Sequence, residues 1–107
     1  MTMQFDVYRN ASERSRLQHP YIMVIQHDYY ADLATRLVLP LSGHPLLKTY
    51  YHQVTPLVNI DFQTLAINAP AMTSIDKAKL NNRLFVCNLR SARPGVIAAL
   101  DALVTNT

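Results

Sequence analysis

Hydrophobic and polar residues alternate with a period of two over most of the chain, which is the pattern typical of β-strands. Strands are expected over residues 3–8, 21–26 and 36–41, over 57–62 with a continuation or a turn into 64–68, and over 71–75 and 83–89. The second of these strands is apolar almost throughout, which predicts that both of its faces are buried. Pro40 within the third strand predicts an edge position or a bulge, because proline cannot donate to a ladder.

The period changes near the C-terminus. From Arg93 onward, large apolar residues recur at helical spacing and cover an arc of about 120°, a usual width for a core-facing stripe. This stripe consists of Val96, Ile97, Leu100, Leu103 and Val104. We therefore expect a helix that packs this stripe on its own sheet, with Ser91 as the N-cap and Pro94 in the first turn.

The opposite face of the predicted helix is nearly uncharged. Its small residues include Ala98, Ala99, Ala102 and Asn106, and Asp101 is the only charged residue after Arg93. A flat alanine face lets another backbone approach closely, so we expect this face to meet a twin subunit in a homodimer. The alternative is a solvated face, because alanine is the best helix former.

Short strands followed by one helix predict a mostly β fold with a C-terminal helix, built as a small barrel or a curled antiparallel sheet. The length of 107 residues fits one domain over residues 1–107. Half of the residues are hydrophobic and 16% are charged, which provides enough apolar surface for a core and argues against intrinsic disorder.

The location of the protein is predicted from what the sequence lacks. The longest apolar runs are far shorter than the ~20 residues that span a bilayer as a helix, so no membrane association is expected. The N-terminus shows no basic region followed by an apolar stretch, so no secretory signal is expected. Cys87 is the only cysteine, and a small domain without disulfides is most simply cytosolic. Its apolar neighbours favour a buried, inert thiol.

Candidate chemistry is sparse. The net charge is +3, and no basic cluster is interleaved with aromatics, so sequence-specific nucleic-acid binding is not expected. Two isolated glycines cannot build a phosphate-binding loop, and the histidines lack zinc spacing. No catalytic residue, metal or cofactor is therefore assigned, and the protein is not expected to be an enzyme. A nucleophilic serine, threonine or cysteine beside a base remains open, because linear spacing does not exclude it.

One aromatic cluster favours binding. Tyr29 and Tyr30 follow a predicted strand within the sequence His-Asp-Tyr-Tyr, and Asp28 and Asp32 flank them. Tyrosine pairs supply large, rigid contact area where binding energy concentrates. The alternative is that one ring packs back onto the barrel.

Taken together, these segments resemble the CcdB toxins of toxin–antitoxin modules, in order and over nearly the whole chain. Residues 3–8 (Met-Gln-Phe-Asp-Val-Tyr) match the family opening, and residues 26–28 (Gln-His-Asp) resemble the Gln-Ser-Asp that ends the second strand. Residues 36–41 (Arg-Leu-Val-Leu-Pro-Leu) are similar to the family's Arg-x-Val-Ile-Pro-Leu strand. The remaining matches are residues 56–60, 72–75 and the helix at 97–104.

The resemblance implies an SH3-like barrel that forms a homodimer through its C-terminal helix region. It also implies that the dimer binds the A subunit of DNA gyrase and traps the enzyme on cleaved DNA. A CcdA-like antitoxin with a disordered acidic tail would neutralise it. The gyrase contacts implied by the family motifs are Tyr29, Tyr30, Asp101, Thr105, Asn106 and Thr107.

Two alternatives stay open. The best-known family ending is Trp-Gly-Ile, whereas this chain ends in Thr-Asn-Thr. A relative that dimerises and binds antitoxin without poisoning gyrase would show such an altered end. The second alternative is a ribonuclease toxin, because MazF- and Kid-type toxins share this barrel, with Arg36, Arg83 and His52 as the candidate residues.

Overall fold

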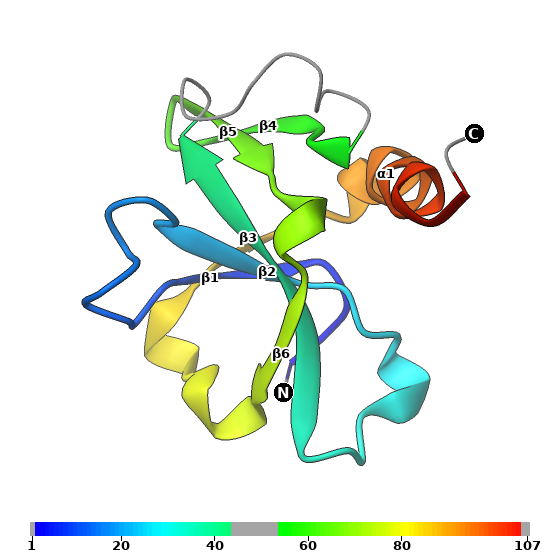
Figure 1. Cartoon of the computed structure of the whole chain (residues 1–107). Coiled ribbons are helices and arrows are strands. Elements are labelled where there is room, and N and C mark those ends of the chain that lie inside the picture. Colours follow the sequence, from blue (N-terminus) through cyan, green and yellow to red (C-terminus); the bar gives the residue numbers. More distant parts are fainter. Residues whose placement is uncertain (1, 44–53, 106–107) are drawn as a thin grey trace.

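β3 (Thr35–Gly43) is the strand around which the sheet is arranged (Figure 1). This is a computed structural model, and it describes residues 2–43 and 54–105. Along one edge, β3 pairs with β2 (Tyr21–Val24), which continues to β1 (Asp6–Arg9) and β7 (Phe85–Asn88). Along the other edge it pairs first with β6 (Thr73–Asp76) and then with β5 (Gln63–Ile67), which continues to β4 (Leu57–Ile60).

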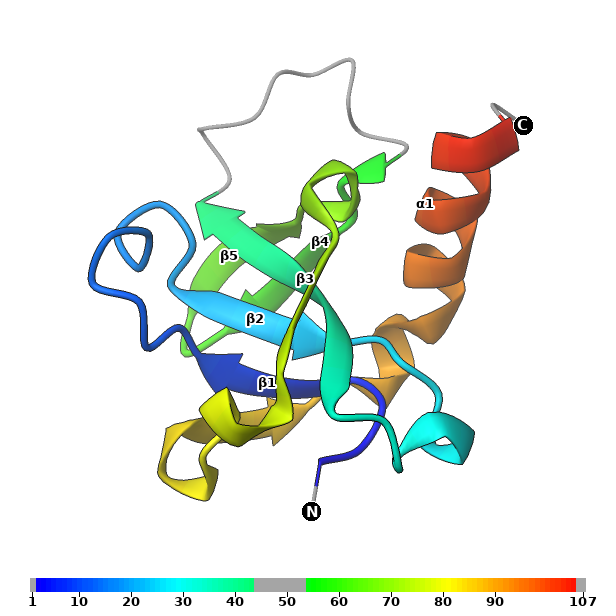
Figure 2. The same cartoon turned by 60° about the horizontal axis from the view of Figure 1, so that its bottom comes forward.

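These seven strands of the described chain form one antiparallel sheet in the order β4-β5-β3-β2-β1-β7, with β6 beside the first half of β3. The sheet curls, and α1 (Arg93–Thr105) lies at its β4 end (Figures 1 and 2). Short 3-10 helices occupy the connections: η1 (Asp28–Tyr30), η4 (Ala69–Ala71), η5 (Lys77–Lys79), η6 (Asn82–Leu84) and η7 (Arg90–Ala92). The predicted mostly β fold, a curled antiparallel sheet with a C-terminal helix, is confirmed.

Two predicted strands have different ends in the structure, and backbone geometry explains both. The first strand begins at Asp6, because Phe5 has a φ of 70° and turns the chain instead of extending it. The fourth strand ends at Ile60, because Asp61 and Phe62 have φ values of 50° and 64°. Two consecutive positive φ values make the type I′ turn that matches the twist of a hairpin. Phe62 is therefore fully exposed in the turn rather than part of the strand.

The prediction that Pro40 marks an edge strand or a bulge is wrong, since β3 has partners on both sides and its register with β2 runs through Pro40 without a shift. The local register shows why proline is tolerated. The carbonyl of Pro40 accepts from the backbone N–H of Asn68 at 2.8 Å, so its backbone groups face the side occupied by β5 and β6. The β6 ladder ends at Val38 and the β5 ladder begins at Leu41. Pro40 thus falls in the gap between two neighbouring strands, where a missing N–H costs no ladder bond.

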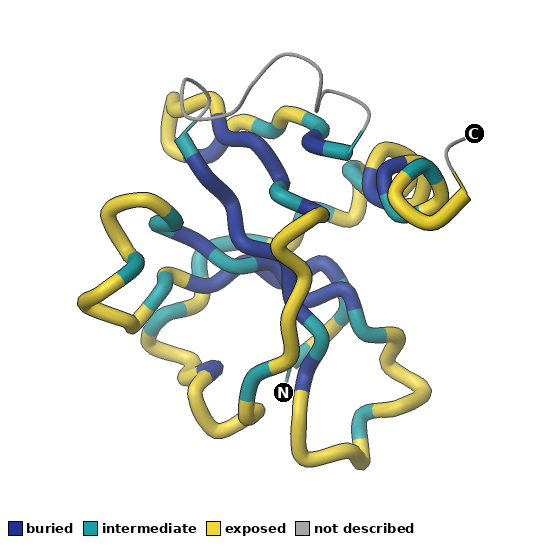
Figure 3. Tube along the Cα trace, viewed as in Figure 1, coloured by how far each residue is buried: buried dark blue, intermediate teal, exposed yellow. Residues whose placement is uncertain are grey.

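Apolar side chains of the sheet form two buried clusters. Figure 3 marks the buried residues along the strands. The larger cluster lies on the face covered by α1, and its fully buried members include Val7, Met23, Leu39, Leu41 and Ile67. The smaller cluster contains Tyr8, Val24, Val38 and Leu80. β2 contributes to both clusters, with three of its four residues buried and Ile22 half-buried. Burial on both faces was predicted for this strand and is confirmed.

The helix was predicted correctly in place but not in orientation. Val96 and Ala99 are its buried residues, with 1% and 0% of their surface exposed, whereas Ile97 and Leu103 are 39% and 42% exposed and Val104 is 82% exposed. The predicted core-facing stripe therefore does not pack on the sheet as a unit. The N-cap prediction is also wrong, because Ser91 lies inside η7, which leads directly into the helix. In the described part of the chain no helix is long and apolar enough to cross a membrane.

Candidate protein-binding site

The two tyrosines predicted to bind a partner both lie on the surface. They belong to η1, where Tyr29 is 81% exposed and Tyr30 is 53% exposed. Their rings pack edge to face against each other, with centroids 5.1 Å apart and planes at 83°. Neither ring belongs to a buried cluster. The exposed position expected for the pair is confirmed, and the pair offers aromatic surface held in a defined shape.

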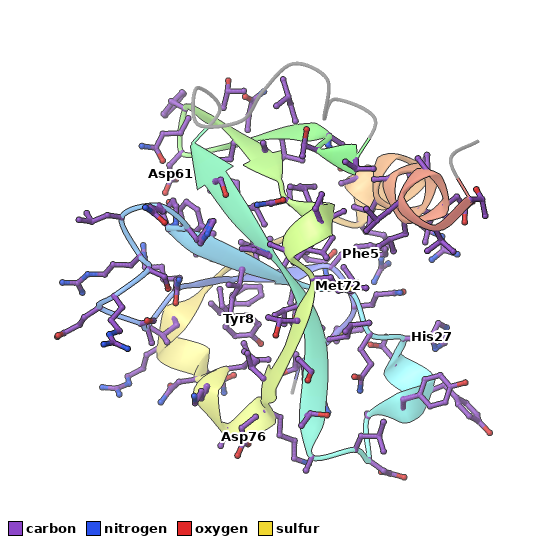
Figure 4. The ribbon with its side chains drawn as sticks, viewed as in Figure 1. Phe5, Tyr8, His27, Asp61, Met72 and Asp76 are labelled. Carbon is purple, nitrogen blue, oxygen red and sulfur yellow. The ribbon has the colours of Figure 1, made fainter. Side chains whose placement is uncertain are left out.

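Side chains before and within η1 fix the backbone of this turn. Nδ1 of His27 accepts from the backbone N–H of Tyr29 at 2.9 Å and caps the turn. Oδ1 of Asp28 accepts from the backbone N–H of Gln4 at 2.8 Å, which ties the turn to the N-terminal segment. The side-chain amide of Gln26 donates to the carbonyl of Tyr30 at 3.0 Å. Figure 4 shows His27 at the outer rim of this turn.

Hydrogen bonds from Arg36 fix the part of the loop that follows η1, residues 31–35. Its side chain is buried, and its guanidinium donates to the carbonyls of Ala31, Leu33 and Thr35 at 2.7–2.9 Å. A buried cation is tolerated only when its hydrogen-bonding capacity is used, so these contacts make Arg36 the internal brace of the loop. A side chain engaged in this way is not available to contact RNA. This removes the main candidate of the ribonuclease hypothesis, whose other members are the exposed Arg83 in η6 and His52, which lies outside the described residues.

The outer face of α1 carries the other predicted contacts that the structure describes. Asp101 is exposed, and the hydroxyl of Thr105 donates to its carbonyl at 2.6 Å. Asn106 and Thr107 lie outside the described residues, so their predicted contacts stay predictions. Figures 1 and 2 both place η1 and α1 on the same side of the sheet. One partner of sufficient size can therefore reach both.

The alanines predicted for the dimer interface do not share one face. Ala98 is exposed and Ala102 is half-buried, but Ala99 is fully buried against the chain's own sheet. Ala99 offers no surface to a partner, so its assignment to the interface needs correction. Its small side chain allows α1 to approach the sheet instead. The exposed large apolar residues of α1 are Ile97, Leu103 and Val104, and Ala98 and Asp101 are exposed as well.

A basic cavity was not foreseen from the sequence, because its cations come from distant segments. It measures about 690 Å³ and lies between residues 10–19 and β6. Arg9 and Lys79 line it, and Arg16 and Arg9 line an adjoining hollow. Its apolar lining comes from Ile22, Val38, Pro40 and Ile75. The signal in the sequence was the pair of short basic runs at 14–16 and 77–79, from which the fold brings Lys79 to the cavity and Arg16 to the adjoining hollow.

Two groups resemble catalytic ones, the His19–Ser42 pair and the Cys87 thiol, but their surroundings do not favour catalysis. Nδ1 of His19 lies 2.7 Å from Oγ of Ser42, but this serine is 1% exposed and out of reach of a substrate. Burial raises the pKa of the Cys87 thiol, and the nearby carboxylates of Asp61 and Asp6 raise it further. A raised pKa lowers the thiolate fraction and with it the reactivity of the thiol. Among the described residues, no group of three His, Cys, Asp or Glu side chains could hold a metal ion.

The structure combines a curled antiparallel sheet and a C-terminal helix with an exposed tyrosine turn, and its family match places it among the toxins of toxin–antitoxin systems. Within that class, the family model of the CcdB protein matches residues 4–106 of this chain, and the chain belongs to the CcdB family. The resemblance seen in the sequence motifs is thereby confirmed. No curated protein matches the chain.

Proposed function

We propose that this CcdB-family toxin acts by binding the A subunit of DNA gyrase and trapping the complex of gyrase with cleaved DNA. The observation that carries the proposal is the η1 turn, in which Tyr29 and Tyr30 are exposed while Arg36 and His27 fix the backbone beneath them. A surface that is rigid before binding loses little conformational entropy when it binds, which favours recognition of a folded partner.

The proposed gyrase contacts are Tyr29 and Tyr30 on η1, and Asp101, Thr105, Asn106 and Thr107 at the end of the chain. Aromatic anchors supply most of the energy in such interfaces, and the rim of polar residues excludes water around them. In this chain the terminal residues lack an aromatic anchor. The tyrosine pair therefore carries the larger share of the proposed contact.

A homodimer is part of the proposal. The exposed side chains of Ile97, Leu103 and Val104 give α1 a mostly apolar outer surface, to which Ala98 and Ala102 add small residues and Asp101 one charge. Apolar patches that stay exposed in a monomer commonly mark contact surfaces. A two-fold contact between two α1 helices would cover this patch on both subunits at once. Asn106 is the remaining predicted member of this contact.

A CcdA-like antitoxin is the second proposed partner, and the basic cavity supports it. Carboxylates of an acidic tail would pair with Arg9, Arg16 and Lys79, and apolar side chains of the tail would enter the lining of Ile22 and Val38. The action we propose needs no covalent chemistry by the toxin, no cofactor and no direct reading of DNA sequence. We place it in the cytoplasm, where gyrase acts.

The test is a gyrase cleavage assay with purified protein. We expect micromolar dimer to stabilise cleaved DNA and to block supercoiling. A variant in which Thr105→Trp, Asn106→Gly and Thr107→Ile are combined should strengthen both effects, since it adds the anchor that the chain lacks. If neither protein stabilises cleaved DNA and total RNA stays intact, the chain is a relative that no longer poisons gyrase. Cleavage of RNA would instead support the ribonuclease hypothesis.

A further inference from the structure

Among the described strands, β4 lies at the edge of the sheet and pairs only with β5. Its hairpin with β5 turns at Asp61 and Phe62, so Ile60 and Gln63 form the hydrogen-bonded pair that closes the turn. Hydrogen-bonded and non-bonded pairs then alternate along the ladder, and the bond from Ile67 N–H to the carbonyl of Pro56 at 2.8 Å fits this alternation. The backbone groups of Leu57 and Asn59 consequently point away from β5. They are donors and acceptors available to another strand.

A groove runs along the side of β4 that faces away from β5. It measures about 400 Å³ and is lined by Pro56, Leu57, Val58, Asn59, Leu89, Ser91, Ala92 and Gly95. One wall is β4 and the other is η7 with the first turn of α1, which appear next to β4 in Figure 1. At its narrow end, a Cβ placed on Gly95 would stand 3.6 Å from the Cβ of Pro56. Volumes of this order hold a few side chains of a ligand.

Two arginines are next in sequence to residues that line the helix wall of this groove. Arg90 and Arg93 are both exposed and flank Ser91 and Ala92, which line it. Asp101, the next acidic residue along the chain, lies more than two turns further along the helix. An incoming strand with acidic side chains would therefore bring its carboxylates toward these exposed arginines while its backbone bonds to β4.

We propose that the free edge of β4 and this groove bind an extended acidic peptide segment of a partner protein as an added strand. Backbone hydrogen bonds to Leu57 and Asn59 would supply affinity, and the groove and the two arginines would select the side chains. This goes beyond the proposed gyrase contact, which uses η1 and the end of α1, and it does not rest on it. It also uses a different surface from the basic cavity beside residues 10–19.

A second copy of this chain fits the edge less well. Two β4 strands paired around a two-fold axis would bring η7 and the start of α1 of each copy toward the other. Each copy carries Arg90 and Arg93 there, so like charges would come together. A single extended peptide with acidic side chains brings no second helix to the site and no like charges.

The first test uses a synthetic probe. An acetylated and amidated hexapeptide of alternating valine and glutamate is titrated into ¹⁵N-labelled full-length protein. We expect amide shift changes at Leu57, Asn59 and Ser91 to Gly95. A peptide with lysine in place of glutamate should bind at least fivefold more weakly. Two further glutamate peptides carry N-methyl groups on the odd or on the even residues. Binding should be abolished in only one of these two peptides, the one whose methylated N–H groups would face β4. Shift changes confined to residues 10–19, equal binding of the lysine peptide, or slow exchange of the Leu57 and Asn59 amides before peptide is added would each overturn the proposal.

Two matched pairs of variants complete the test. Asn59→Pro and Leu57→Pro remove an outward N–H that β5 does not use, while Asn59→Ala and Leu57→Ala keep it. We expect each proline variant to bind the glutamate peptide about 3–10-fold more weakly than its alanine partner, as loss of a hydrogen bond predicts. Thermal unfolding identifies a proline variant that has lost its fold. In that case the N-methylated peptides, titrated into the wild-type protein, test the backbone hydrogen bonds instead. Equal binding by both members of each folded pair would refute the added strand. In gyrase assays the same variants should be as active as wild type. The proposed gyrase contact and the proposed peptide site on β4 can therefore be refuted independently of each other.

Discussion

The side chain of Asn88 is bonded to the backbone of Gln4, although 84 positions separate the two residues in the chain. Its Nδ2 donates to the carbonyl of Gln4 at 3.0 Å and to Oδ1 of Asp6 at 2.9 Å, while its Oδ1 accepts from the backbone N–H of Arg90. The N–H of Gln4 in turn donates to Asp28 in η1. A continuous set of hydrogen bonds therefore joins η7, at the base of α1, to the turn that carries the tyrosines.

Asn88→Ala tests this connection. The change leaves a backbone carbonyl and a carboxylate without a shared donor, so we expect the free energy of unfolding to fall by about 1–2 kcal/mol. Faster hydrogen exchange at the amides of Gln4 and Tyr29 should accompany the loss. Asn82→Ala is the control, because Asn82 is an exposed asparagine of η6. If both variants exchange alike, the connection does not steady η1.

The tyrosine pair should matter for binding and not for stability. Because both rings are exposed, Tyr29→Ala and Tyr30→Ala should each change the free energy of unfolding by less than about 1 kcal/mol. Loss of a central aromatic anchor should weaken the gyrase complex more than tenfold in the cleavage assay. Phe62→Ala removes an aromatic ring that is more exposed than either tyrosine from the β4–β5 turn and should leave poisoning unchanged. Equal loss with Phe62→Ala would indicate a general effect of surface aromatics.

Arg36→Gln should unfold the loop from within. The guanidinium donates to three backbone carbonyls, and glutamine cannot reach all of them, so we expect a loss of about 2–3 kcal/mol in the free energy of unfolding. Gyrase poisoning should fall as well, because the tyrosines lose their support. Arg83→Gln removes an exposed arginine and serves as the control. An Arg36→Gln protein that melts like wild type but loses activity would show that this arginine contacts a partner.

The approximate positions of the strands and of the helix along the chain could be predicted, because period-two and helical patterns depend on neighbouring residues. Strand ends at Phe5 and Ile60 could not, because they depend on positive φ values at residues that usually avoid them. The orientation of α1 depends on how closely it approaches the sheet. Ala99 fits that narrow space, and the larger Ile97 does not share its face. The exposed tyrosines followed from their acidic neighbours, but their brace by Arg36 and the cation-lined cavity arise from tertiary contacts alone.

Cys87 should react slowly at neutral pH. Burial, then Asp61 and Asp6, raise the pKa of its thiol above the ordinary 9.0, so the folded protein keeps it protonated. The unfolded chain loses this proton first as the pH rises, so stability should decline above about pH 9 through this group. Alkylation by iodoacetamide at pH 8 should be at least tenfold slower in the native protein than in denaturant. Asp61→Asn should speed the alkylation modestly, because it removes a carboxylate that raises the pKa of the thiol, and asparagine tolerates the positive φ at this position. Asp32→Asn is the control and should leave the rate of alkylation unchanged.

Two neighbouring alanines on α1 should have different roles, Ala98 in the proposed dimer contact and Ala99 in the fold. Substitutions at the two positions therefore test self-association and folding separately. Ala98 is exposed, so Ala98→Glu should leave the fold intact and weaken the proposed dimer by placing a charge in its apolar patch. Ala99 is fully buried, so Ala99→Val should overpack the contact between α1 and the sheet and cost about 1–3 kcal/mol in the free energy of unfolding.

Sedimentation and thermal melts at several protein concentrations distinguish the two effects. Ala98→Glu should sediment as a monomer at concentrations where wild type is a dimer, and its melting temperature should lose its dependence on concentration. Ala99→Val should melt earlier at every concentration and still dimerise once folded. Ala78→Glu, on an exposed alanine of η5, should match wild type in both measurements. Undiminished dimerisation of Ala98→Glu would place the dimer contact elsewhere than on the outer face of α1.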